Sequence, residues 1–122
     1  QTGLRAFKTG GTGGTAAWAF ARQCLRSTRI AVVGMDFGYC LDTPLEQTQE
    51  WNMLKDKPNV AEFYPRHNGY WGEAYTSPTY WWYRSNFLDL LDGSTVTNCS
   101  GAGLLYGEGV RCMELETWLN GL

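Results

Sequence analysis

The run at residues 29–35 restricts the fold of this chain more than any other segment, since it reads RIAVVGM. Its four central residues are all aliphatic, and no polar side chain alternates with them. A strand that is apolar on both faces is typical of the centre of a parallel sheet that helices cover on both sides. We therefore expect an α/β fold in which this segment is the central strand.

Helical patterns occupy much of the remaining sequence. Apolar spacing and capping residues predict helices over the ranges 16–25, 43–54, 77–91 and 114–120. In the first of these helices the buried face is expected to hold the apolar residues at helical spacing, namely Ala17, Phe20, Ala21, Cys24 and Leu25. The glycine-rich segment before it, residues 9–15, is expected to be irregular.

Short strands are predicted between these helices, at residues 4–8, 95–99 and 110–113, with the last one at a sheet edge. Residues 61–76 are rich in aromatic side chains and are expected to form a long irregular loop. The alternation of strands and helices predicts a Rossmann-like three-layer sandwich with a mainly parallel sheet.

The length of 122 residues fits one domain. Glycine-rich sequence arrives by Gly10, before any strongly apolar strand, whereas a doubly wound domain normally opens with a buried strand. We therefore expect an N-terminally incomplete domain, with residues 1–122 forming the C-terminal part of a longer one. An exposed sheet edge in such a domain would favour a homo-oligomer.

Charge and apolar content exclude several classes of protein. A net charge of −2 provides no basic surface for a dedicated nucleic-acid binder. The longest aliphatic stretch has four residues, far short of the ~20 that span a bilayer, so no transmembrane segment is expected. The four cysteines form no C-x-x-C pair, and we expect reduced, mostly buried thiols and a cytoplasmic protein.

The strongest local signal for a binding site is the glycine-rich run that leads into the first helix. Backbone N–H groups at a helix N-terminus attract anions, and threonine hydroxyls add donors. The run therefore predicts a phosphate-binding turn at Gly11, Thr12, Gly13, Gly14 and Thr15. A flexible linker before the helix is the alternative. The same run also satisfies the dinucleotide pattern G-x-G-x-x-A, which keeps an NAD-binding oxidoreductase as an alternative.

Asp36 follows the apolar strand at its carboxyl end, where open parallel sheets bind their ligands. A carboxylate at this position accepts hydrogen bonds from sugar hydroxyls, acts in catalysis or holds Mg²⁺ through water. A strand-end cap is the structural alternative. The sequence thus predicts a crevice shared by the amides near residue 12 and the carboxyl group of Asp36.

The aromatic segment contains further candidates. His67 is the single histidine, and histidine is the usual general base near neutral pH, although a surface imidazole without a role is more frequent. Arg66 is suited to a phosphate or carboxylate. Tyr70, Trp71 and Tyr75 present flat faces for sugar rings, nucleobases or a partner surface.

Three longer matches carry a family resemblance: TGGTGGTAAWAFA, IAVVGMDFGY and TNCSGAGLLYGEGVRCMELETWL. Together they resemble the MptE-like Rossmann family of 6-hydroxymethylpterin pyrophosphokinases and motility accessory factors. That family is similar in layout to bacterial CMP-sialic acid sialyltransferases. The resemblance implies that Phe37 and Tyr39 line the nucleotide or donor-sugar pocket beside Asp36. It also implies that a late loop lies near the same crevice, with Asn98, Ser100, Gly101 and Gly103, and that His67 acts as the base.

The function expected from these observations is a nucleotide-dependent group transferase. Its most specific form is a glycosyltransferase-like enzyme that uses a CMP-activated acidic sugar in surface-glycan synthesis, with no certain cofactor. An ATP- and Mg-dependent pterin pyrophosphokinase, with Mg²⁺ held by Asp36, is the first alternative. An NAD-binding oxidoreductase and a non-catalytic binding domain or fragment are the others.

Overall fold

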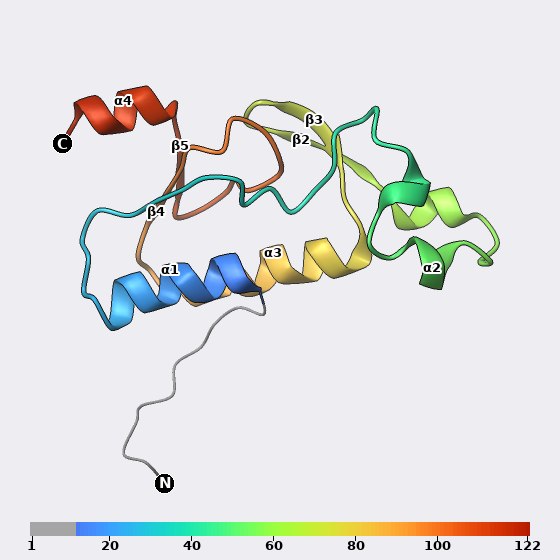
Figure 1. Ribbon diagram of the computed structural model, residues 1–122, viewed down its shortest axis with the longest axis horizontal. Helices are drawn as coiled ribbons and strands as arrows, with labels where there is room; N and C mark the ends of the chain where they lie inside the picture. The colour runs from blue at the N-terminus through green and yellow to red at the C-terminus, as the bar shows by residue number, and fades with distance from the viewer. Residues whose placement is uncertain (1–11) are drawn as a thin grey trace, which may run out of the picture.

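The computed structural model describes residues 12–122, which form a mixed α/β fold around a small parallel sheet (Figure 1). The sheet contains β1 (Ala31–Val32), β4 (Val96–Asn98) and β5 (Val110–Cys112) in the order β1-β4-β5. Both strand pairs are parallel, and their register aligns Ala31 with Thr97 and Thr97 with Arg111. The α/β class is therefore confirmed. The segments at 95–99 and 110–113 do form strands, with β5 at an edge.

The position of the apolar run in this sheet differs from the prediction. Only Ala31 and Val32 of residues 29–35 pair as a strand, and β1 lies at an edge of the sheet formed by the described residues, while β4 lies at its centre. Val32 is buried, whereas Val33 is 62% exposed. The chain leaves the strand at Gly34, whose φ of +78° turns the backbone away before the apolar run ends.

Helix α1 (Gly13–Gln23) begins three residues earlier than predicted, so the glycine-rich run is helical from Gly13 onward. Thr12 and Thr15 form a capping box, in which each side chain accepts from the backbone N–H of the other residue. This reciprocal pair satisfies two N–H groups of the first turn and offsets the conformational cost of the glycines. The predicted strand at 4–8 and the residue Gly11 lie outside the described part of the chain.

The predicted buried face of α1 is also wrong. Thr15, Trp18 and Ala19 are the buried residues of the helix, whereas Ala17, Phe20, Cys24 and Leu25 of the predicted face are exposed and Ala21 is half-buried. Trp18 is 3% exposed and meets Phe87 edge-on, with 5.3 Å between the ring centroids. Burial of this large ring, together with the edge-to-face aromatic contact, decides which side of α1 faces the core.

Helix α3 (Pro78–Leu91) agrees closely with the sequence. The Ser77 side chain accepts from the Tyr80 N–H, Pro78 occupies the first turn, and Asp92 ends the helix in the left-handed region. The core contains residues from α1, α3 and the sheet, together with two residues from the connecting loops: Trp18, Ala19, Val32, Phe37, Phe87, Leu91, Val96 and Leu105.

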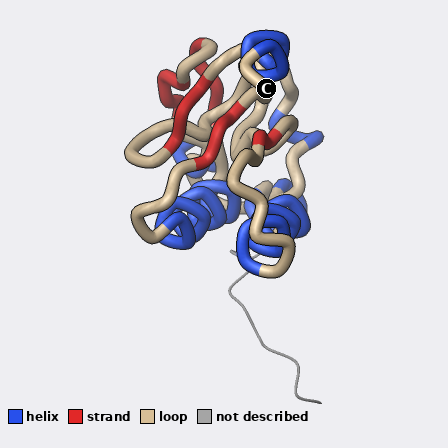
Figure 2. The backbone as a smooth tube through the Cα atoms, turned by 90° about the vertical axis from the view of Figure 1, so that its left-hand side faces the viewer, coloured by secondary structure: helices blue, strands red, loops and turns tan. Residues whose placement is uncertain are grey.

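Figure 2 shows α1 and α3 together on one side of the strands, with α4 (Leu115–Asn120) on the other. The four-turn helix α3 and the three-turn helix α1 bury one face of the sheet, and the six-residue α4 is the helix on the opposite side. The two faces of the sheet are thus covered unequally.

The helix predicted over 43–54 is not continuous. The structure has a 3-10 turn, η1 (Leu45–Gln47), then a separate α-helical turn, α2 (Trp51–Leu54). Thr48 interrupts the helix in an extended conformation, because its hydroxyl hydrogen-bonds the Leu45 carbonyl and the Tyr64 hydroxyl, each at 2.7 Å. This buried polar contact overrides the local helical pattern.

The segment predicted as an irregular loop, 61–76, is largely ordered. It begins within η2 (Val60–Phe63) and continues as an antiparallel hairpin of β2 (Arg66–Gly69) and β3 (Gly72–Tyr75). Gly69 and Gly72 bracket the two-residue turn, and Gly72 has a φ of +126° that favours glycine. These two glycines, which lie among aromatic residues, are the sequence signal for the hairpin.

The remaining expectations concern the state of the cysteines and the absence of a transmembrane segment. All four cysteines are free thiols, although Cys24 and Cys40 are exposed rather than buried. Among residues 12–122, no helix has the length and apolar character to cross a bilayer.

Candidate functional site

Three chain segments come into close contact: residues 36–38, the hairpin of β2 and β3, and the loop at residues 103–104. Glycines allow their backbones to approach. A Cβ atom on Gly103 would lie 2.6 Å from the Cα of Asp36, and one on Gly69 would lie 2.3 Å from the Gly103 carbonyl oxygen. A Cβ on Gly38 would lie 2.9 Å from the Tyr75 carbonyl oxygen. The Leu104 N–H donates to the Asp36 carbonyl at 2.7 Å. This junction fixes the backbone at Asp36 relative to the hairpin and the late loop.

A crevice of about 210 Å³ opens beside this junction, and we refer to it as the α1 crevice. It brings the start of α1, the segment after β1 and one side of α3 together. Its lining residues are Thr12, Gly14, Val33, Gly34, Met35, Asp36, Phe37, Tyr80 and Tyr83. Of the predicted phosphate-binding turn, Thr12 and Gly14 line this crevice together with Asp36.

The N-terminus of α1 supplies backbone donors to the α1 crevice. Gly13 and Gly14 are the first two helical residues, so their N–H groups have no acceptor within the helix. A Cβ atom on Gly13 would meet nothing within 4 Å, and one on Gly14 would lie 3.2 Å from the Met35 methyl carbon. Of these two residues Gly14 lines the α1 crevice, and a free N–H at a helix N-terminus is a donor suited to a small anion.

Asp36 is the titratable side chain of the α1 crevice whose environment is most unusual. Its Oδ1 atom is buried and has no hydrogen-bond partner among the described residues. Burial raises the pKa of the Asp36 carboxyl above its ordinary value of 3.8. A carboxyl group that retains its proton more readily can donate a hydrogen bond to an anion, and it can act as a general acid.

The predicted late-loop residues support the wall of the α1 crevice. Ser100 Oγ accepts from the N–H groups of Gly34 and Met35, at 3.0 and 3.3 Å, and donates to Asn98 Oδ1 at 2.6 Å. Asn98 is fully buried, and its Nδ2 donates to the Leu105 carbonyl. Gly101 and Gly103 turn the loop with φ values of +78° and +93°. Asn98 and Ser100 therefore hold the β1 exit loop in position.

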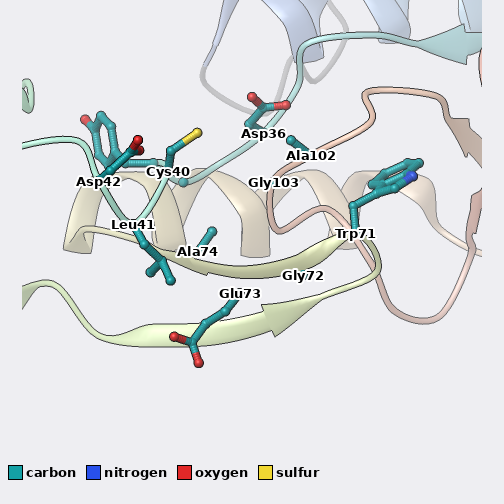
Figure 3. Close-up of a pocket in the computed structure, with 12 residues that line it drawn as sticks. Asp36, Cys40, Leu41, Asp42, Trp71, Gly72, Glu73, Ala74, Ala102 and Gly103 are labelled. Atoms are coloured by element: carbon teal, nitrogen blue, oxygen red, sulfur yellow. The ribbon is translucent and has the colours of Figure 1, made fainter.

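A second cavity, of about 290 Å³, lies between Asp36 and the hairpin, and we call it the hairpin cavity (Figure 3). Tyr39 and Trp71, two predicted pocket residues, line it, together with the carboxylates of Asp36, Asp42 and Glu73. Glu73 is paired with Arg66 at 3.2 Å. Asp36 lines both cavities and is therefore the side chain that connects them.

A stack of tyrosines that the sequence did not predict joins the two cavities. The Tyr39 ring stacks on Tyr75 and on Tyr80, at centroid distances of 5.3 and 5.0 Å. The Tyr39 hydroxyl donates to Glu50 Oε1 at 3.3 Å, and burial raises the pKa of Tyr39. Tyr75, a predicted ligand contact, is 5% exposed and donates to the Thr43 carbonyl, so the structure places it within the packing.

Glu50 is the other buried carboxyl at this stack. It is 4% exposed, and its Oε2 atom has no hydrogen-bond partner among the described residues. Burial raises the pKa of Glu50. Since Glu50 starts α2 within a segment of helical pattern, nothing in its sequence position indicates this burial.

The structure does not bring His67 into either cavity. Its ring stacks on Trp81, with 4.1 Å between centroids and an angle of 9° between the planes. Arg84 lies 4.5 Å from the same indole and donates to the carbonyls of Leu104 and Tyr106. The aromatic surroundings of His67 thus fasten the hairpin to α3. Tyr70, at the hairpin turn, is 63% exposed and lines neither cavity.

Within residues 12–122 no group of three or more His, Cys, Asp or Glu side chains is arranged to hold a metal ion. Asp36 is the acidic residue in the α1 crevice. A Mg²⁺ ion there would take Asp36, waters and ligand phosphates as its oxygen donors.

No family model matches the chain, and comparisons with curated proteins and with solved structures gave no match either.

Proposed function

We propose that this chain is a nucleotide-binding domain of a group transferase, and that the α1 crevice binds the phosphate of the nucleotide. The observation that carries the proposal is that Gly14, at the N-terminus of α1, and the half-buried Asp36, whose Oδ1 has no partner among the described residues, line one crevice. Backbone donors at a helix start and a protonated carboxyl can both donate to phosphate oxygens.

The charge of the α1 crevice favours a ligand with a single phosphate. No lysine or arginine is among its lining residues, and the Thr12 hydroxyl donates to Thr15 Oγ1, so the donors are the N–H group of Gly14 and the Asp36 carboxyl in its protonated form. A triphosphate carries a larger charge, which proteins ordinarily offset with basic side chains or Mg²⁺. We therefore place a CMP-linked sugar ahead of ATP as the donor and propose a glycosyltransferase-like activity with an acidic sugar.

Each residue of the α1 crevice has a defined role in this proposal. The N–H group of Gly14, in the first turn of α1, binds the phosphate and stabilises it as it departs. The rings of Tyr80 and Tyr83 face the crevice from α3 and pack against the nucleoside. As the acceptor hydroxyl bonds to the sugar carbon, the bond from that carbon to the phosphate oxygen breaks and Asp36 donates its proton to that oxygen. The proton of the acceptor hydroxyl then passes to the Asp36 carboxylate, which also lines the hairpin cavity. The acceptor sugar then occupies the hairpin cavity on the other side of Asp36.

The wider context belongs to the same proposal. In this proposal the α/β core is part of a Rossmann-like sandwich of the MptE-like type. The exposed free thiols of Cys24 and Cys40 fit a reducing compartment, which supports a cytoplasmic location. Association of two copies along the β1 edge stays a prediction, for which size-exclusion chromatography with light scattering is the test.

A ligand panel with a matched pair of variants tests the proposal. Thermal shift is measured with CMP, a CMP-linked sugar, ATP with Mg²⁺, and NAD. We expect CMP ligands to raise the melting temperature without metal. The substitution Gly14→Ala adds a methyl group inside the α1 crevice and should weaken CMP binding, whereas Gly13→Ala adds one in open space and serves as the control.

Each other outcome of this panel contradicts the proposal in a recognisable way. Stabilisation by ATP only with Mg²⁺ would favour the pyrophosphokinase, and stabilisation by NAD the oxidoreductase. If no nucleotide raised the melting temperature, the result would favour a non-catalytic domain. Equal loss of CMP binding in both glycine variants would show that the effect comes from the helix and not from the crevice.

A further inference from the structure

The pleat of the sheet divides its side chains between two faces with different chemistry. Val32 and Val96 point into the core formed with α1 and α3. Successive residues of a strand alternate between faces, so Thr97 belongs to the opposite face, together with its register partners Ala31 and Arg111. Arg29, two residues before Ala31, is on this face as well. Helix α4 lies on the opposite side of the strands from α1 and α3 (Figure 2), so it covers the face that carries Arg29, Thr97 and Arg111.

A groove of about 490 Å³ lies on this face, between the strands and α4, and we call it the α4 groove. The residues that line it come from the start of β1, from β4 and β5, and from α4. They are Thr28, Arg29, Ile30, Thr95, Thr97, Arg111, Met113, Thr117, Trp118 and Gly121. None of them lines the α1 crevice or the hairpin cavity.

The charge of the α4 groove is positive, in a chain whose net charge is −2. Two guanidinium groups and four threonine hydroxyls line it, and no carboxylate does. Arg29 is held in place, because its Nη1 donates to the Gly121 carbonyl at 2.9 Å and its guanidinium lies 5.9 Å from the Trp118 ring. Arg111 is exposed and forms no ion pair with any residue in 12–122.

This arrangement is unusual for a parallel sheet, whose two faces are ordinarily both covered by apolar packing. Arginine matches phosphate oxygens with its fork of N–H donors, and threonine hydroxyls add neutral donors to the same oxygens. Trp118 supplies a flat apolar surface beside them for the organic part of a ligand. We propose that the α4 groove binds a small phosphate monoester, with its phosphate between Arg29 and Arg111.

The number of positive charges limits the ligand to a small molecule. Proteins that bind nucleic acid tightly make roughly 6–10 phosphate contacts through basic side chains. The α4 groove offers two arginines, which matches the two charges of one phosphate monoester. The proposal does not depend on the α1 crevice, since the two sites share no residue and lie on different parts of the fold.

Binding of glycerol 3-phosphate, with glycerol as the uncharged analogue, tests this inference at constant ionic strength. Isothermal titration gives the affinity, and ¹H–¹⁵N spectra locate the site. We expect glycerol 3-phosphate alone to bind and to shift the amides of Thr97, Arg111 and Thr117. The amides of Gly13 and Gly14 should not move, which separates this site from the α1 crevice.

Substitutions at Arg111 complete the test, because this exposed side chain can change without loss of the fold. Arg111→Gln should weaken binding by about tenfold or more, the usual effect of losing a charged hydrogen-bonding partner. Arg111→Lys should retain part of the affinity, and Arg22→Gln, on the exposed side of α1, should leave it unchanged.

Three results would overturn the inference. The first is equal binding of glycerol 3-phosphate by the wild-type and Arg111→Gln proteins, and the second is equal binding of glycerol and its phosphate. The third is tighter binding of a single-stranded oligonucleotide at matched phosphate concentration, which would show that the groove follows a polymer backbone.

Discussion

Asp36 has more consequences for the site than any other single residue. It lines both cavities, its Oδ1 is buried without a partner among the described residues, and its pKa is raised. An ionised carboxylate at the open end of α1 would repel a phosphate, whereas a protonated one would donate to it. The protonation of Asp36 should therefore control how strongly the α1 crevice binds nucleotides.

We expect the affinity for a CMP-linked sugar, whose phosphodiester does not titrate in this range, to be highest at low pH and to fall as the pH rises through the raised pKa of Asp36. Asp36→Asn imitates the protonated group and should keep the affinity while removing this pH dependence. Titrations between pH 4 and pH 8 measure both effects. An unchanged pH profile in Asp36→Asn would remove this carboxyl from phosphate binding.

Glu50 gives a prediction about stability at the same scale. The unfolded chain ionises Glu50 near its ordinary pKa of 4.5, and burial raises the pKa in the folded protein. The unfolded state therefore loses its proton first, so the free energy of unfolding should fall as the pH rises from about 4.5 through the folded pKa.

Glu50→Gln should consequently stabilise the protein at pH 8, by about 1 kcal/mol or more, and should have little effect at pH 4. Urea unfolding at the two pH values measures this difference. Gln49→Glu, which adds a carboxyl at the exposed neighbouring position, is the control and should show no such dependence. A Glu50→Gln effect of equal size at both pH values would contradict the burial of an ionisable group.

Among the elements, the late loop shows how a turn positions a site. Gly101 and Gly103 both have positive φ, but a Cβ atom on Gly101 would meet nothing, whereas one on Gly103 would overlap Asp36. The loop is tied further to β1 through Ser100. The backbone at Asp36 therefore depends on one glycine more than on the other.

Gly101→Ala should cost about 1–2 kcal/mol, the price of a left-handed conformation, and should keep ligand binding. Gly103→Ala should cost clearly more and should disturb the α1 crevice, because Asp36 has to move. Chemical denaturation and ¹H–¹⁵N spectra of the two variants provide the comparison. Equal costs would mean that the close contact between residues 36 and 103 is absent.

The elements also show which sequence signals were sufficient. Helix α3 was predicted to its limits because Ser77, Pro78 and Asp92 act locally. The continuous helix predicted over 43–54 does not form, because Thr48 and Glu50 are buried. Thr48 contacts Tyr64 and Glu50 contacts Tyr39, and neither partner is at helical spacing along the sequence. Helix α1 starts earlier than the glycines suggest, because the capping box of Thr12 and Thr15 stabilises a helical first turn.

At the scale of the molecule, the sequence predicted the α/β class but not the arrangement of the sheet. The apolar run at 29–35 suggested a strand covered on both faces, yet β1 is an edge strand among the described residues. The long helices lie on one face of the sheet (Figure 2). The opposite face carries the polar groove around Arg111. Apolar content alone does not distinguish a central strand from a short edge strand that continues into a buried loop.

The sequence predicted the site only in part, because some of its contacts depend on tertiary packing. Asp36 and the start of α1 meet because a strand end and a helix start are close in an α/β fold. His67, by contrast, lies against Trp81 because the hairpin folds onto α3, a contact between distant segments that no local pattern indicates. The tyrosine stack around Tyr39 likewise depends on tertiary packing.

The central claim is that the open amides of α1 and the carboxyl of Asp36 bind one nucleotide, and a ¹H–¹⁵N titration with CMP tests it most directly. We predict saturable shifts of the backbone amides of Gly13, Gly14, residues 33–37, Tyr80 and Tyr83. Shifts that map to the hairpin or to α4 while these residues remain unmoved would contradict it.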